Sequence, residues 1–254
     1  MGGHGGLDFA GGTVIHINSG AAALVAALML GKRKGWGKEA MHPHNIGMTL
    51  LGAGILWFGW FGFNAGSALA ADGIAVNAFF TTQVAAGAAA LSWIIAEWIF
   101  QGKPTTLGAA SGAVAGLVAI TPGSGFVGPV PAIIIGLVGG ALCYMAVCLK
   151  TKIGYDDSLD VVGVHGVGGL WGALATGLFA STAVNPGGAN GLFFGNPKLF
   201  AIQALDAGST IVYSLIMTFI ILKAIDLLVG LRVSRDDEVQ GLDLTQHSEI
   251  GYTM

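Results

Sequence analysis

Long, uninterrupted apolar runs constrain this chain more than any other feature of its sequence. A helix needs about 20 mostly apolar residues to cross a hydrocarbon core of about 30 Å. Seven runs approach or exceed that length, near residues 7–31, 46–71, 77–101, 106–123, 129–149, 159–181 and 199–230. Because the runs are continuous and not alternating, they predict helices rather than the strands of a membrane barrel. The expected fold is therefore an all-α polytopic membrane protein with seven transmembrane helices.

The composition excludes the other common classes of protein. Only 10% of the 254 residues are charged and 54% are hydrophobic, which excludes a soluble domain and a disordered chain. A net charge of −3 is not that of a basic, nucleic-acid-binding protein. Cys143 and Cys148 are too few for a disulfide framework, and we expect both to be small core residues. We expect neither a metal nor a cofactor.

Positive charges alternate from one connection to the next. Of the eleven Lys and Arg residues, ten lie in the odd-numbered connections or toward the end of the chain, and the even-numbered connections hold only Lys198. The positive-inside rule therefore predicts a cytoplasmic C-terminus and places Met1 outside the membrane. We divide the chain into a transmembrane domain, residues 1–230, and a cytoplasmic tail, residues 231–254.

Small residues recur at helical spacing within the runs. Gly108, Gly112 and Gly116 form one row, and Gly136 with Gly140 forms another. Such rows let helix backbones approach closely in a membrane, so they predict a tightly packed bundle.

Two histidines are the most unusual polar groups within the runs. At 1.5 Å per residue, His16 and His165 both lie near the midplane, His16 about 13 Å below the outer edge. Ionisable groups at this depth are costly and are candidates for function. Two touching imidazoles would satisfy each other and offer a nitrogen to a small polar guest such as a proton, water or ammonia. The alternative is two unrelated histidines that each bond to a backbone carbonyl.

A second polar cluster lies on the second run. Phe63 and Ser67 are four residues apart and share a helix face. A ring beside a hydroxyl makes a weak cation site through the ring quadrupole. An aromatic belt at the membrane interface would give the same pattern.

Three segments together resemble the signature motifs of the Amt/Mep/Rh ammonium transporter superfamily, and of its Amt branch in particular. They are Asp8-Phe-Ala-Gly-Gly-Thr-Val-Ile-His16, Gly59-Trp60-Phe-Gly-Phe63-Asn-Ala-Gly-Ser67 and Asp157-Ser-Leu-Asp160-Val-Val-Gly-Val-His165. The tail, with Gly241, Asp243, His247 and Tyr252, is similar to the cytoplasmic tail of that family. The resemblance covers essentially the whole chain.

The resemblance implies a mechanism and partners. Ser67 and Phe63 match an outer site where ammonium is recruited and gated, and Asp8 matches an acid that supports this site. Ammonia then passes a hydrophobic pore lined by His16 and His165, and the proton follows through them. Trp60 and Asp160 fall in the same motifs and are expected to support the pore region. Members of the family form homotrimers in the lipid bilayer, and the tail can bind a PII-type signalling protein.

The resemblance also implies that part of the family's fold is absent. Its members typically have eleven helices, ten of them in a five-plus-five inverted repeat, and the seven runs match helices five to eleven. The faces that carry His16, Phe63 and His165 would then lack their partners. We therefore expect the 254-residue chain alone to insert without saturable methylammonium uptake.

Other functions stay open on the residues alone. Two midplane histidines on different helices could bind one haem iron, as in a bis-histidine electron carrier. Ser124, in Pro122-Gly-Ser-Gly125, lacks the first glycine of an intramembrane serine protease motif. An inactive transporter fragment with a purely structural role is a further alternative.

Overall fold

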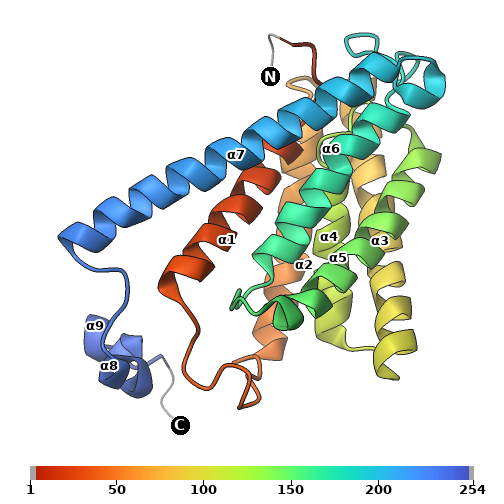
Figure 1. Ribbon diagram of the computed structural model, residues 1–254. Coiled ribbons are helices and arrows are strands. Elements are labelled where there is room, and N and C mark those ends of the chain that lie inside the picture. The colour runs from red at the N-terminus through yellow and green to blue at the C-terminus, as the bar shows by residue number, and fades with distance from the viewer. Residues whose placement is uncertain (1–3, 252–254) are drawn as a thin grey trace.

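The computed structural model describes residues 4–251, and within that range every regular element is a helix. Figure 1 shows the long helices grouped in a bundle, with α7 running diagonally beside α1 and α6. The elements are the π-helix η1 (Gly12–Ile17), α1 (Asn18–Leu30), α2 (Ile46–Gly66), α3 (Gly73–Gln101), α4 (Thr106–Ile120), α5 (Pro129–Ile153), the π-helix η2 (Val162–Val167), α6 (Gly168–Phe179), the short η3 (Leu192–Phe194), α7 (Pro197–Leu228), α8 (Arg235–Gln240) and α9 (Leu242–His247). Met1 and Tyr252 lie outside the described residues.

Six helical segments within residues 4–251 are long and apolar enough to cross a membrane. They are Gly12–Leu30, Ile46–Gly66, Gly73–Gln101, Pro129–Ile153, Val162–Phe179 and Pro197–Leu228. The remaining predicted span is α4, whose 15 residues rise only about 22 Å. It ends at Ile120 because Pro122 has no N–H to continue the helix, and buried turns carry the chain onward. Six of the seven predicted spans are thus long and apolar enough to cross a membrane, and the fourth, which the sequence already marks as short, is a shorter apolar helix.

Side-chain caps fix where several helices begin. Asn45 accepts a hydrogen bond from the N–H of Met48 at the start of α2, and Asp72 caps α3 through the N–H groups of Ile74 and Ala75. Such caps satisfy backbone donors that have no partner within the helix. The cap at Asp72 explains why α3 begins at Gly73 and not at the predicted residue 77.

The core lies where α3 packs against α4 and α5. A Cβ added at Gly112 would lie 2.6 Å from Trp93 Cβ and 2.9 Å from the Cα of Ala90, and one at Gly116, Gly136 or Gly140 would also overlap α3. The two glycine rows therefore allow α4 and α5 to lie directly on α3, as expected for small residues in membrane helices. Cys143 belongs to this core, but Cys148 is exposed on α5, so the expectation that both cysteines are core residues is wrong. Because Cys143 and Cys148 are five residues apart, their side chains point about 140° apart around the axis of α5.

The long helix α7 packs against α1 and the segment before η1, and side-chain hydrogen bonds join them. Gln203 donates a hydrogen bond to the carbonyl of Leu7 (2.7 Å) and accepts one from the Leu7 N–H (2.7 Å). Ser214 donates to the carbonyl of Asn18 at 2.9 Å. These bonds hold the segment before η1 and the start of α1 against α7, and so fix the position of the first histidine.

Candidate functional site

The two histidines of the apolar runs meet at the centre of the bundle. His165 Nδ1 lies 3.2 Å from His16 Nδ1, and the rings are tilted by 46° with their centroids 5.2 Å apart. A neutral imidazole donates from one nitrogen and accepts at the other, so one ring donates to its neighbour across this contact. His16 is only 3% exposed, whereas His165 is partly exposed.

Local backbone geometry brings the rings together. His16 lies in the π-helix η1 and His165 in the π-helix η2, and such segments occur often at functional sites. A Cβ at Gly20 would overlap the backbone of Gly166, and one at Gly169 would lie 3.0 Å from His16 Cβ. Each histidine segment therefore packs against a glycine of the other helix, which allows the backbones to approach closely.

Aromatic side chains of α2 cover His16. The Trp60 ring stacks on the His16 ring, with centroids 5.2 Å apart and an angle of 22° between the ring planes. The centroid of the Phe63 ring lies 6.0 Å from that of His16. The Trp60 indole N–H donates to Thr121 Oγ1 at 3.0 Å, which fixes its orientation. The expectation that His16 would lie on a face without partners is wrong, because α2 and η2 cover it within this chain. Phe63 itself is 37% exposed.

Ser67 follows the last residue of α2. Its hydroxyl donates to the carbonyl of Phe63 at 2.7 Å, as a residue at a helix end can do. The hydroxyl and the Phe63 ring are therefore held one helical turn apart at the C-terminal end of α2. The other end of α2 lies toward the connections at the C-terminal ends of α1, α3 and α5, which carry most of the Lys and Arg residues and which we call the basic loops.

Asp8 lies four residues before the start of η1. Its Oδ2 accepts hydrogen bonds from the N–H groups of Thr13 (3.1 Å) and Val14 (3.2 Å). Its Oδ1 is buried and has no hydrogen-bond partner among the described residues. Asp8 thus caps the helix that carries His16 and keeps one oxygen free.

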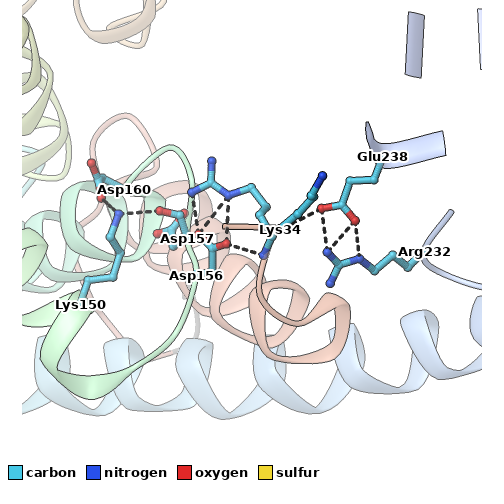
Figure 2. A network of polar contacts seen from close by, with 8 residues as sticks. Lys34, Lys150, Asp156, Asp157, Asp160, Arg232 and Glu238 are labelled. Carbon is cyan, nitrogen blue, oxygen red and sulfur yellow. Dashed lines mark hydrogen bonds and ion pairs between the residues drawn. The ribbon is translucent and has the colours of Figure 1, made fainter. Parts of the chain in front are cut away.

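The basic loops meet the acidic segment before η2 at one end of the bundle (Figure 2). Arg33 binds Asp156 through its guanidinium, with Nη2 2.6 Å from Oδ1, and through its backbone N–H, 2.7 Å from Oδ2. Burial raises the pKa of Asp156, but the hydrogen bonds and charge of Arg33 outweigh it and hold that pKa below its ordinary value. Lys150 donates to the Asp157 carbonyl (2.7 Å) and forms an ion pair with Asp160. Asp160 therefore supports the segment before His165 and not the ring itself.

The tail joins the same end of the bundle. Glu238 of α8 accepts from the backbone N–H of Lys34 at 3.0 Å and from Arg232 Nη2 at 2.8 Å. Arg232 also donates to the carbonyl of Leu30 at 2.9 Å. Figure 2 shows the contacts of Glu238 with Lys34 and Arg232 beside the acidic segment. The loop that follows α1 is thus held by the tail on one side and by Asp156 on the other.

Two adjoining cavities lie between His165 and this end of the bundle. The smaller, of about 150 Å³, is lined by His165 together with Val164, Thr49 and Ser111, among others. The larger, of about 1000 Å³, shares Thr49, Leu107, Ser111 and Leu159 with it and extends to Lys150 and Asp160. The second histidine therefore lines a small cavity that adjoins a larger one at the end of the bundle with Lys150 and Asp160. Sequence patterns do not reveal Thr49, Ser111 or Thr121 as residues of the site, because a lone hydroxyl residue forms no motif.

The geometry disfavours the two other chemistries. The imidazoles of His16 and His165 already touch, which leaves no room for a haem iron between them. Ser124 is fully buried, and its carbonyl accepts hydrogen bonds from Asn77 (3.0 Å) and Thr81 (2.9 Å). Ser124 is therefore a structural residue of the turn after α4.

A bundle of apolar, membrane-length helices around two touching histidines, one of them buried, is a multi-pass membrane protein with a polar site in its interior. No group of three or more His, Cys, Asp or Glu side chains suited to a metal ion occurs in residues 4–251. The chain belongs to the ammonium transporter family, because the model described as "Ammonium Transporter Family" matches residues 1–252.

Individual relatives agree with this assignment. The ammonium transporter of Bacillus subtilis (strain 168) is 55% identical over 249 residues, which cover 98% of this chain and 61% of the relative. Ammonium transporter Amt1 of Archaeoglobus fulgidus is 52% identical over 249 residues, which cover 98% of this chain and 63% of the relative. The crystal structure of Saccharomyces cerevisiae Mep2 matches with a TM-score of 0.86 and 38% identity, over 92% of this chain and 55% of that one.

These relatives are transporters and not enzymes. The chain spans 61% and 63% of the length of the bacterial and the archaeal relative. What the whole proteins transport and assemble with is therefore carried to this chain only as a proposal.

Proposed function

We propose that this chain supplies the histidine-bearing part of an ammonium-conducting pore. Ammonium is recruited at an outer site that includes Phe63, Ser67 and Asp8 and gives up its proton there, and this proton follows through the two histidines. Neutral ammonia then passes along the apolar interior beside His16 and His165. The observation that carries this proposal is the pair of imidazoles in contact at 3.2 Å, in a chain of the ammonium transporter family.

The free ring nitrogen of His16 supports this role. His16 Nε2 is buried and has no hydrogen-bond partner among the described residues. A buried nitrogen without a partner is costly unless a guest or water satisfies it. Ammonia, which both donates and accepts, fits such a nitrogen. The contact between the two rings also suits a proton relay, because an imidazole can accept a proton at one nitrogen and donate one from the other.

Selectivity follows from the low polarity of the path. Moving a bare ion into an apolar interior costs far more than moving neutral ammonia. Potassium has no proton to release, so it keeps its charge and is rejected. Trp60 and Asp160 support this path, Trp60 by covering His16 and Asp160 through its ion pair with Lys150.

The proposal includes an orientation and partners. The end with the basic loops and the tail faces the cytoplasm, and the end with Asp8 and Ser67 faces outward. The chain works as part of a homotrimer, and the tail offers a surface to a PII-type signalling protein. A solved structure described as "Sensor Amt Protein", with a TM-score of 0.86 and 31% identity, supports a link between this fold and signalling.

A chimera tests the proposal directly. This chain replaces the matching 249 residues of the Bacillus subtilis ammonium transporter, and methylammonium uptake is measured in cells that lack their own ammonium transporters. We expect saturable uptake by the chimera and none by the 254-residue chain alone. His16→Ala and His165→Ala should abolish or alter uptake, whereas His165→Glu should retain part of it because a carboxylate can still relay a proton.

The matched control is His247→Ala, which removes an exposed histidine of α9. It should leave uptake unchanged. Normal uptake by both pore-histidine variants, at the same amount of chimera in the membrane, would contradict the proposal.

A further inference from the structure

The two histidine segments share a backbone pattern that begins at an aspartate. His16 follows Asp8 by eight residues, and His165 follows Asp157 by eight. The third residue after each aspartate has a positive φ, 95° at Gly11 and 59° at Asp160. Each aspartate is thus followed by a left-handed residue and then by a π-helix that holds the histidine.

The hydrogen bonds of the two segments match as well. Asp8 Oδ2 accepts from the N–H five residues later, at Thr13 (3.1 Å), and Asp157 Oδ2 accepts from the N–H five residues later, at Val162 (2.8 Å). The N–H of the seventh residue donates to the carbonyl of the third in both segments, at 2.8 Å for Ile15 and 2.9 Å for Val164. Two segments far apart in sequence therefore use one carboxylate-capped design.

We infer that Asp157 is the positioning residue of His165. Its carboxylate holds the N–H of Val162, the first residue of η2, and so fixes where the π-helix begins. A slip of one residue along a helix turns a side chain by about 100°, which would carry the His165 ring away from His16. Asp157 is 6% exposed, and Lys150 holds its carbonyl at 2.7 Å. The capping residue is therefore anchored to α5 through Lys150 and is shielded from solvent.

Placement of the oxygen, and not its charge, is what this role requires. Asp157→Asn keeps an oxygen at the same position that can accept from Val162, although it removes the charge. Asp157→Glu keeps the charge but moves the carboxylate by one methylene. Asp157→Ala removes both. The three variants therefore separate capping from electrostatics.

The test measures the contact between the rings in the 254-residue chain itself. The chain is reconstituted in lipid nanodiscs with isotope-labelled histidine, and magnetic resonance detects the ring-to-ring signal of His16 and His165. Loss of this signal in His165→Ala identifies it. We expect Asp157→Asn to keep the signal, and Asp157→Glu and Asp157→Ala to lose it. Asp156→Asn, at the neighbouring acid whose side chain binds Arg33 and not η2, should keep it.

Two results would overturn the inference. One is an unchanged ring contact in Asp157→Ala. The other is the reverse order of the conservative pair, with contact kept in Asp157→Glu and lost in Asp157→Asn; this pair decides the matter even if Asp157→Ala does not fold. The role in conduction rests on the proposed function, but the ring contact is measured without transport, so failure of the one is distinguishable from failure of the other.

Discussion

At Gly20 the backbone of α1 lies so close to Gly166 that no other residue fits without moving a helix. A Cβ there would overlap the backbone of Gly166, which cannot rotate away as a side chain can. We expect Gly20→Ala to lower the free energy of unfolding by about 1–3 kcal/mol, in the range found for overpacked cores. The measurement is thermal unfolding of the purified chain in detergent micelles, where the variant should melt at a lower temperature.

Gly59→Ala is the control for this prediction. A Cβ at Gly59 meets no atom within 4 Å among the described residues, and alanine favours a helix over glycine by about 1 kcal/mol. Its melting temperature should stay the same or rise. Equal destabilisation by the two substitutions would show that close packing at Gly20 does not hold the histidine segments together.

Single residues differ in how far the sequence reveals them. The ring residues of the site all stand in motifs, and the structure brings together His16, His165, Phe63 and Trp60. Thr121, which orients the Trp60 indole, stands in no motif because one hydroxyl in an apolar run carries no pattern. Asp157 belongs to the motif of the second histidine, but a motif does not show which N–H its carboxylate meets. That role depends on the folded backbone, although the spacing of eight residues between aspartate and histidine is visible in both segments.

Between elements, the ion pair of Arg33 and Asp156 joins the loop after α1 to the segment before η2. Asp156 has a fully buried side chain, so removal of its partner leaves a buried carboxylate unpaired. Because Arg33 is 44% exposed and partly screened, we expect Arg33→Ala to cost about 1–3 kcal/mol of stability at neutral pH. Arg33→Lys should cost less, since it keeps the charge and loses only the two-pronged contact.

This contribution depends on pH with a definite sign. The pKa of Asp156 lies below its ordinary value in the folded chain, so the pair stabilises at neutral pH and is lost as pH falls through that lowered pKa. Unfolding of the native chain and of Arg33→Ala, measured from pH 7 into the acid range, should therefore converge at low pH. A difference between them that stays constant with pH would contradict the pairing.

Element boundaries show what apolar patterning can and cannot predict. It places α2, α5 and α7 within a few residues, because long apolar runs and caps such as Asn45 are local signals. It misses the π-helices η1 and η2, since one altered turn does not change the apolar pattern. It extends α4 to residue 123, three residues past its last helical residue Ile120, because the turn that follows is buried like the helix itself.

For the whole molecule, the distribution of charge predicts which end faces which side of the membrane. Lys34→Cys and Lys103→Cys lie in the basic loops, and Asp72→Cys lies at the start of α3, in the connection between α2 and α3. With Cys143 and Cys148 replaced, an impermeant thiol reagent added outside intact cells should label Asp72→Cys and spare the other two. Labelling of Lys34→Cys from outside would show that the orientation is the opposite of the predicted one.

The central claim is that the touching histidines carry ammonia and exclude ions. Its most direct test is the chimera reconstituted in liposomes, with ammonium and potassium movement measured side by side. The intact chimera should conduct ammonium and exclude potassium, and His16→Ala and His165→Ala should either stop conduction or admit potassium. Ammonium conduction at the native rate by both variants, with potassium still excluded, would contradict the claim.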